Sequence, residues 1–338
     1  MKDGRFLTLG IETSCDETAA SVTADGRRVL SNVISSQIET HVLYGGVVPE
    51  IASRMHLEAI NTVVEKALAD ADCELQDIDL IGVTNGPGLI GAVVIGVATA
   101  KALSLAAGIP LIGVNHMHGH VSANYLAYPD LEPPFMALVV SGGHTDIIWV
   151  HDYDSYEVIG STRDDAAGEA FDKVARVIGL GYPGGPKIDR AAKSGDPDAV
   201  KFKRVLLDDG SLDFSFSGLK TQVLSFVNRE RMRGNEIKTE DIAAGFQSAV
   251  VETICAKARI AVERHGEKRI VMAGGVASNS ALRRGMKEMC DKTGTALYVP
   301  EPKLCTDNAA MIACAAYYKY KKHGADGLDL DAFADMPY

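Results

Sequence analysis

Two short segments of the sequence resemble each other, and they limit the folds open to this chain. LGIETSCDETAASV (9–22) and ALVVSGGHTDIIWV (137–150) each place apolar residues on both sides of a small-residue loop, and the two loops have equal length. Both segments are typical of a strand, a tight turn and a second strand. Two such hairpins, about 130 residues apart, favour two related domains over a short-period repeat array, although chance similarity between hairpins is the alternative.

Helical and extended patterns alternate after each hairpin. Strands that alternate with helices indicate an α/β fold with largely parallel sheets. The segment PDLEPP (129–134) is the expected linker between the two halves. In the first half, the patterns predict a helix from Pro49, a strand over 80–86, a helix over 89–107 and a strand over 110–115. In the second half, they predict a helix from Thr239, a strand over 269–276, a helix over 279–294 and a strand over 296–301.

Length and charge narrow the class of protein. A chain of 338 residues with 46% hydrophobic and 23% charged residues is long enough for two domains with cores of their own, and it is not typical of a disordered protein. The formal net charge of −11 argues against a general binder of polyanions. Any contact with nucleic acid would therefore need a local basic patch or a helper protein.

Cysteine spacing and apolar runs bear on location. The six cysteines are scattered without a C-x-x-C pair, which favours a reducing compartment over a disulfide framework. Acidic residues interrupt the N-terminal segment before it could form the apolar core of a signal peptide, so we expect no signal peptide. The longest apolar stretch, 89–114, contains Lys101 and a Gly-Ile-Pro segment, so we expect a buried helix followed by a strand and not a membrane span. These features predict a cytoplasmic protein.

The motif NHMHGH (115–120) concentrates three of the nine histidines. On a helix, residues four apart share a face, so His116 and His120 could hold one metal ion while His118 points elsewhere. Histidines that bind no metal are the alternative. A zinc protease would need Glu directly after the first histidine, and Met117 stands there. The sequence therefore argues against a protease, and Gly119 additionally weakens the helical propensity.

Two glycine loops and three acidic positions complete the candidate sites. VSGGHT (140–145) and MAGGVASN (272–279) could each present free backbone N–H groups to an anion, or could simply be a hairpin turn and a capped strand-to-helix connection. Asp172 is predicted near the start of a helix, where it could bind hydroxyl groups or only favour the first turn. Asp189 follows a PGGP loop, and Asp307 could be a helix N-cap or a metal ligand.

Taken in order, these segments resemble the TsaD family over almost the whole chain, from about residue 10 to residue 316. The resemblance implies the two-domain fold of actin-like ATPases, sugar kinases and Hsp70, with duplicated mixed sheets, flanking helices and a cleft. It places the first domain at 1–130, completed by a helix at about 308–322, and the second at 131–307. The motifs that carry the resemblance are GIETSCDETAASV, GGVVPEIASRMH, NGPGLIGAVVIG, NHMHGH, VSGGHT, FDKVARVIGLGYPGGP, FSFSGLKT, MAGGVASN and CTDNAAMIA.

The family's activity implies a reaction for this chain. Members transfer a threonylcarbamoyl group from threonylcarbamoyl-AMP to the exocyclic amine of adenosine 37, in tRNAs that read codons beginning with A. The resemblance also implies a divalent metal, with iron(II) expected and zinc or magnesium as alternatives. His118 departs from the family, in which Glu is common at this position. The implied metal ligands are His116, His120 and Asp307, and the implied substrate-binding residues are Val140, Ser141, Gly142, Gly143, His144, Asp172, Gly185, Asp189 and Asn279.

The resemblance also suggests partners and rival functions. The family works on tRNA with a TsaB-like paralogue and a TsaE-like ATPase, and the helices 50–69 and 89–107 are candidates for the protein interface. A sugar or acetate kinase of the same fold would instead turn over ATP with a small alcohol or acid, and a non-catalytic scaffold would need no metal ligands. Candidate contacts to the tRNA backbone are Lys201, Lys203, Arg204, Arg229, Arg231 and Arg233.

Overall fold

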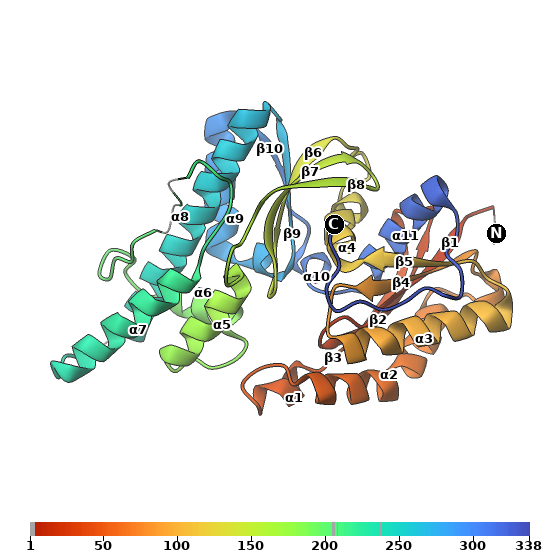
Figure 1. The fold of residues 1–338 in the computed structure, drawn as a ribbon, viewed down its shortest axis with the longest axis horizontal. Helices are drawn as coiled ribbons and strands as arrows, with labels where there is room; N and C mark the ends of the chain where they lie inside the picture. Colours follow the sequence, from red (N-terminus) through yellow and green to blue (C-terminus); the bar gives the residue numbers. More distant parts are fainter. Residues whose placement is uncertain (1–3, 205–206, 208, 237) are drawn as a thin grey trace. The chain divides into compact units, whose positions relative to one another are not determined.

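The computed structural model of the chain describes residues 4–204, 207, 209–236 and 238–338. These residues form two compact units, which Figure 1 shows in sequence colours. The domain limits expected above, 1–130 with 308–322 and 131–307, remain a prediction of how the chain divides. The first unit comprises Met1–Pro134, Val150–Tyr156 and Lys303–Tyr338, and the second comprises Phe135–Trp149 and Glu157–Pro302.

The first unit is built on a five-stranded mixed sheet with the order β3-β2-β1-β4-β5. The hairpin read from the sequence is β1 and β2, which pair antiparallel, while β1, β4 and β5 run parallel. All residues of β1, β4 and β5 are buried, as expected for strands covered on both faces. The strands are β1 (Leu7–Glu12), β2 (Glu17–Ala24), β3 (Arg28–Ser36), β4 (Leu80–Gly86) and β5 (Leu111–Asn115).

Helices cover both faces of this sheet. Figure 1 shows α2 and α3 on one face and α4 and α11 on the other, and each of these helices contacts strands of the sheet. Helix α3 ends at Gly108, whose φ of 69° is a left-handed conformation that favours glycine. The helical segments are α1 (Ile38–Val42), α2 (Pro49–Asp70), the short turn η1 (Leu75–Asp77), α3 (Ile90–Ala107), α4 (His116–Ala127), α10 (Pro302–Cys305) and α11 (Ala309–His323).

Helix α11 approaches the first sheet unusually closely, because glycines face it. A Cβ atom on Gly10 of β1 would lie 2.3 Å from the carbonyl oxygen of Ala309, and one on Gly82 of β4 would lie 2.3 Å from the Cβ of Ala316. Small residues on both surfaces therefore let the helix backbone rest almost directly on the strands. This contact brings the residues just before α11 to the first unit.

The second unit repeats the topology of the first. Its sheet has the order β10-β9-β6-β7-β8, which from the opposite edge is β8-β7-β6-β9-β10 and matches β3-β2-β1-β4-β5 strand for strand. Strand β9 runs parallel to β6 and β10. The expectation of two related domains from two similar hairpins is therefore confirmed. The strands are β6 (Phe135–Val140), β7 (Thr145–Asp152), β8 (Ser155–Ser161), β9 (Arg269–Ala273) and β10 (Ala296–Tyr298).

The helices of the second unit follow its hairpin and its central strand. Asn279 caps α9 by accepting hydrogen bonds from the N–H groups of Ala281 and Leu282. Helices α8 and α9 pack against each other. The helical segments are α5 (Ala167–Val177), α6 (Gly184–Ala192), α7 (Ser217–Met232), α8 (Thr239–His265), the turn η2 (Gly275–Ser278) and α9 (Ser280–Thr293).

Two expectations about helices need correction. Helix α3 is long and apolar enough to cross a membrane by length and composition, but it is not a fully buried helix, since 28% of its residues are buried. One face packs on the sheet, and the other exposes apolar side chains. Gly119 does not break α4, because a Cβ there would lie 2.6 Å from Ile312 Cδ1, so the glycine allows α4 to pack closely on α11.

The residues after α11 form a strap along the first sheet, which the sequence patterns did not predict. Asp326 pairs with Leu111 of β5, and the N–H of Phe333 donates to the carbonyl oxygen of Asn85 at 2.8 Å. The side chain of Asn115 donates to the carbonyl oxygen of Pro337 at 3.0 Å. The strap therefore crosses from the edge strand to the carboxyl ends of β4 and β5, where α4 begins.

We predict that Gly10→Ala destabilises the protein by about 1–3 kcal/mol, because the added methyl group would overlap the backbone of α11. Urea unfolding followed by circular dichroism measures the change. Gly275→Ala is the matched control, since a Cβ at that position has no heavy atom within 4 Å. Equal stability of the two variants would show that α11 does not depend on this close approach.

Candidate functional site

Two imidazole rings face each other at the start of α4. The helix begins directly after β5, and the side chain of Asn115 caps it by accepting from the N–H of Met117. His116 and His120 are four residues apart, so both rings project from the same side of the helix. Their centroids are 4.6 Å apart, and both side chains are almost fully buried.

A carboxylate from the far end of the chain completes the group. Asp307 Oδ1 lies 3.5 Å from His116 Nε2 and 3.2 Å from His120 Nε2. One ligand atom from each of the three residues lies within 4.8 Å of the others. The sequence left open whether Asp307 is a helix N-cap, and this alternative is wrong: Asn308 caps α11 by accepting from the N–H of Met311. The Asp307 carboxylate is therefore not needed by the helix.

Two of these side chains, His116 and Asp307, have strongly shifted pKa values. Burial would lower the pKa of His116, but the carboxylates of Glu12 and Asp307 raise it well above its usual value. Burial would raise the pKa of Asp307, but the charge and hydrogen bond of His116, with a smaller effect of His120, hold it well below its usual range. The carboxylates of Glu12 and Asp307 therefore favour a positive charge at this cluster.

The donor set fits a divalent metal ion. Two imidazole nitrogens and one carboxylate on neighbouring elements can coordinate one ion and leave further positions open. The buried ring nitrogens of His120 have no hydrogen-bond partner among the residues that the structure describes, and Nε2 faces Asp307 at 3.2 Å, so a bound cation would give this nitrogen a partner. His116, His120 and Asp307 therefore form a candidate metal site.

Glu12, at the carboxyl end of β1, contacts this site, and sequence reasoning missed it. Its carboxylate is completely buried and lies 2.8 Å from His116 Nδ1. It also accepts from the hydroxyl of Thr84 at 2.6 Å and from the N–H of Ser14 at 2.5 Å. The available signal was an acidic residue that ends an otherwise apolar strand, LTLGIE.

Two more acids lie nearby, Asp16 at the end of the loop between β1 and β2 and Glu17 at the start of β2. Both are candidates for a proton acceptor on sequence grounds, and Asp16 is buried while Glu17 is partly buried. Burial raises the pKa of Glu17 to about 10, and the carboxylates of Asp307 and Asp16 add to the shift. Burial and the neighbouring carboxylates therefore favour the neutral form of Glu17.

His118 points away from the two ligand candidates, as the helical spacing predicts. Its ring stacks on Tyr156 with a centroid distance of 3.9 Å, and its Nδ1 lies 3.8 Å from Asp154 Oδ1. Burial lowers the pKa of His118 to about 4. This histidine is therefore a neutral packing residue near the end of the strap, where Tyr338 also approaches its ring.

In the second unit, the predicted anion loop joins β6 to β7. Strand β6 ends at Val140, and the N–H of Ser141 donates to the carbonyl oxygen of His144 at 2.8 Å, which closes the turn. Gly142 and Gly143 are exposed, and within the described part of the chain their N–H groups donate to no protein acceptor. The turn therefore presents two free N–H groups at the carboxyl end of a central strand.

The other predicted substrate residues lie on connected elements of the same unit. Asp172 is in the middle of α5 and not in its first turn, which corrects the sequence reading. Its carboxylate accepts from the N–H of Gly184 at 2.6 Å, next to Gly185 at the start of α6. Asp189 of α6 accepts from the hydroxyl of Ser280, the residue after Asn279, at 2.7 Å.

Close backbone contacts join these elements to the anion loop. A Cβ on Gly168, in the first turn of α5, would lie 2.5 Å from the carbonyl oxygen of Ser141. A Cβ on Gly274, just after β9, would lie 2.4 Å from the carbonyl oxygen of Val140. The predicted residues thus surround the carboxyl ends of β6 and β9, the edge where open α/β sheets bind ligands.

Most of the predicted basic patch is neutralised. Glu230 lies 3.0 Å from Arg229 and 3.4 Å from Arg233, and Arg204 pairs with Glu252. Lys201 likewise pairs with Asp198 at 3.1 Å. These four side chains are therefore weak candidates for a phosphate-binding surface.

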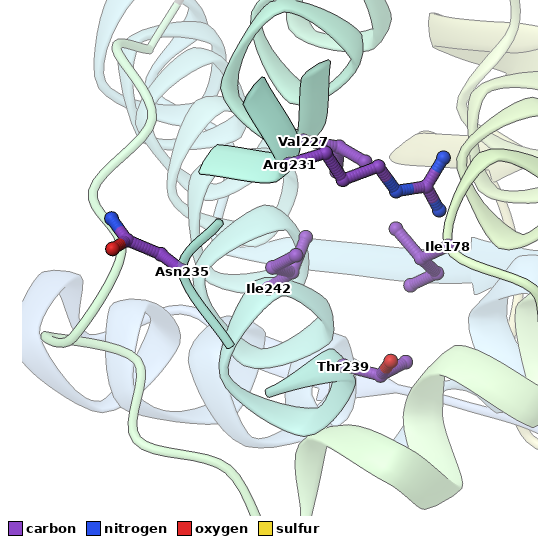
Figure 2. A pocket seen from close by; sticks show the side chains of 6 residues that line it. All are labelled: Ile178, Val227, Arg231, Asn235, Thr239 and Ile242. Carbon is purple, nitrogen blue, oxygen red and sulfur yellow. The ribbon is translucent and has the colours of Figure 1, made fainter. Parts of the chain in front are cut away.

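Arg231 differs from these neighbours, because it makes no ion pair with a carboxylate among the described residues. Figure 2 shows its side chain extending over a pocket toward Ile178. The pocket has a volume of about 270 Å³, with apolar side chains and the hydroxyl-bearing Thr239 at the start of α8. Its lining residues are Ile178, Val227, Arg231, Asn235, Thr239 and Ile242.

Comparisons with known proteins give one family. Residues 28–314 match the TsaD family, described as tRNA N6-adenosine threonylcarbamoyltransferase. A tRNA N6-adenosine threonylcarbamoyltransferase of Clostridium botulinum is 55% identical over 97% of this chain and 96% of its own length. The protein of the same name from Clostridium kluyveri is 54% identical over 99% of this chain and 98% of its own length.

Solved structures agree on the fold. Full-length HypF, in its phosphate- and nucleotide-bound form, superposes with a TM-score of 0.63 at 16% identity, over 95% of this chain and 47% of that one. Component A of the (R)-2-hydroxyglutaryl-CoA dehydratase of Acidaminococcus fermentans gives a TM-score of 0.52 at 18% identity, over 94% of this chain and 98% of that one. These likenesses support the fold of actin-like ATPases and sugar kinases. The chain belongs to the TsaD family of tRNA N6-adenosine threonylcarbamoyltransferases.

Proposed function

We propose that the chain transfers the threonylcarbamoyl group of threonylcarbamoyl-AMP to the exocyclic amine of adenosine 37 in tRNAs that read codons beginning with A. The observation that carries the proposal is the cluster of His116, His120 and Asp307 in a chain that belongs to this family. A scaffold without catalysis would have no use for three converging ligands.

The reaction places modest demands on the protein. The amine nitrogen forms a bond to the carbamoyl carbon, the bond from that carbon to the phosphate oxygen breaks, and AMP leaves. The amine also loses a proton, which AMP or solvent can accept. Because the donor is already an activated mixed anhydride, catalysis requires positioning and charge stabilisation more than a protein nucleophile.

His116, His120 and Asp307 would hold the metal, which we propose to be iron(II). Two imidazoles and one carboxylate with open positions are typical ligands of iron(II), while zinc and magnesium are alternatives. When bound, the ion would supply Lewis acidity toward a phosphate or carbonyl oxygen. Asp307 and the buried Glu12 supply the negative charge that favours a cation there.

The second unit would bind the adenylate part of the donor. The free N–H groups of Gly142 and Gly143 are suited to an anionic group, as in other backbone nests. Val140, Ser141 and His144 shape this turn. Asp172, Gly185, Asp189 and Asn279 would fix the remaining polar groups of the donor, because they surround the same strand ends.

An apolar surface on α2 and α3 suits a partner protein, which we propose to be a TsaB-like paralogue. Leu57 is 63% exposed, and Ile90 and Val94 are each nearly half exposed. The two helices pack closely at this point, because a Cβ on Gly91 of α3 would be 2.5 Å from the hydroxyl of Ser53 on α2. A paralogue of the same fold would bring an apolar helix face of its own, and a TsaE-like ATPase would join the complex.

Arg231 would contribute a contact to tRNA. Its guanidinium group is not paired with a carboxylate among the described residues, whereas Arg229 and Arg233 are. A net charge of −11 makes such local cations important for binding an RNA. The six free cysteines and a tRNA substrate are consistent with the cytoplasm as the proposed location.

Metal binding tests the proposed ligands directly. We predict that Asp307→Ala and His120→Ala lose stoichiometric binding of iron(II), because each removes one of three ligands. Anaerobic titration with iron(II), followed by metal analysis after desalting, measures the loss. His118→Ala is the matched control on the same helix, since its ring stacks on Tyr156 and should leave metal binding intact.

Reconstitution tests the reaction. Threonylcarbamoyl-AMP, unmodified tRNA and iron(II) should give threonylcarbamoyladenosine in the tRNA, detected by nucleoside mass spectrometry, with a higher yield when a TsaB-like partner is added. The double variant His116→Ala with His120→Ala should give no product while keeping its circular dichroism spectrum. Full activity of that variant would contradict the metal-assisted mechanism. If the wild type gave no product with its partners, steady ATP turnover would favour a kinase.

Salt-dependent tRNA binding tests Arg231. We predict that Arg231→Ala weakens tRNA binding and lowers the slope of log K against log salt by about 1, the effect of one lost phosphate contact. Arg233→Ala is the control, because this side chain is already paired with Glu230. A filter-binding series at several salt concentrations measures both slopes. Equal slopes for the two variants would remove Arg231 from the tRNA surface.

A further inference from the structure

We propose that Glu12 is a positioning residue, whose carboxylate holds the His116 ring so that Nε2 faces the metal. The inference rests on the proposed function only in that it takes a metal at His116, His120 and Asp307. It concerns how tightly the metal is held, and it assigns a role to a residue outside the ligand set.

The two nitrogens of His116 face different carboxylates. Nδ1 lies 2.8 Å from Glu12 Oε2, a normal hydrogen-bond distance, while Nε2 lies 3.5 Å from Asp307 Oδ1. A metal ligand nitrogen must be free of its proton, so the remaining ring proton has to sit on the other nitrogen. Glu12 accepts a hydrogen bond from the Nδ1–H group of His116, which keeps the proton on Nδ1 and leaves Nε2 free for the metal.

Glu12 is itself held in place. Its side chain is completely buried, and its carboxylate accepts hydrogen bonds from the Thr84 hydroxyl and the Ser14 N–H as well as from His116. A buried carboxylate is unfavourable unless its oxygens are paired. These contacts fix its position at the end of β1, so that it can fix the ring in turn.

The second histidine lacks such a partner. Nδ1 of His120 is buried and has no hydrogen-bond acceptor among the described residues, so no carboxylate behind the ring sets its orientation. The two ligands are therefore unequal. His116 is the anchored ligand, and carboxylates in this second position typically change metal affinity about 10–100-fold.

Ser14 offers the competing explanation. Its hydroxyl oxygen lies 3.1 Å from the same Nδ1, so a neutral hydroxyl and not the carboxylate could orient the ring. The carboxylate is the closer acceptor, and its charge strengthens the hydrogen bond. A test must therefore separate Glu12 from Ser14.

Titration of the full-length protein with Co²⁺, followed by its visible absorption, measures the Kd and the coordination geometry in one experiment. We expect Glu12→Ala to raise the Kd about 10–100-fold and to alter the spectrum. Glu12→Gln keeps the shape and an acceptor oxygen but loses the charge, so its Kd should rise by less. Ser14→Ala should bind close to the wild type. Melting temperatures recorded without metal show whether the fold is intact.

The outcomes separate the two proposals. If Glu12→Ala and Glu12→Gln bind Co²⁺ as tightly as the wild type, or if Ser14→Ala loses as much affinity as Glu12→Gln, the role of Glu12 is wrong. If Glu12→Ala does not fold, an unchanged Kd for Glu12→Gln is sufficient to reject it. Failure of the wild-type protein to bind Co²⁺ would instead reject the metal site itself, and with it the proposed metal-assisted mechanism.

Discussion

The close contact between α11 and the first sheet is the constraint on which the candidate metal site depends. Gly10 and Gly82 remove the side chains that would hold the helix away, and Gly119 lets α4 pack against the same helix. Asp307 lies two residues before α11, so this packing carries a carboxylate from residue 307 to imidazoles at residues 116 and 120. Three glycines that hold no ligand themselves thus bring Asp307 next to the two histidines.

The site also shows how buried charges balance one another. Glu12 and Asp307 place two carboxylates on either side of His116, and Asp16 and Glu17 lie just after β1 in the sequence, at the end of the loop and at the start of β2. Several carboxylates this close together are unfavourable without a nearby positive charge, because a buried ion needs a partner of opposite charge. The carboxylates of Glu12 and Asp307 raise the pKa of His116, and a divalent ion would compete with the proton that they favour. The same electrostatics therefore favour metal binding and make it compete with protons.

Local patterns predicted the elements of the first half well, but the strands predicted over 269–276 and 296–301 end three residues earlier, at Ala273 and Tyr298, and the long-range contacts were predicted poorly. Helical spacing alone paired His116 with His120 and turned His118 away, and a change of period located β4, α3 and β5 within one residue. The cap at α11 could not be assigned, because Asp307 and Asn308 are both good caps and only the hydrogen bond to Met311 distinguishes them. Glu12 and the strap after α11 were missed because their partners lie about a hundred residues or more away in the sequence.

The fold by itself does not decide between acyl transfer and phosphoryl transfer. HypF and the dehydratase component share the architecture at 16–18% identity, so the topology is compatible with very different reactions. The side chains at the carboxyl ends of the strands in each sheet have to distinguish acyl transfer from phosphoryl transfer. Free N–H groups at residues 142 and 143 suit the anionic part of any nucleotide, and they do not discriminate. We propose that His116, His120 and Asp307 distinguish this chain, because two imidazoles and a carboxylate that converge on one point could hold a metal ion that polarises an activated acyl donor. The specificity of this chain is therefore expected to reside in the first unit, although both units have the same strand order.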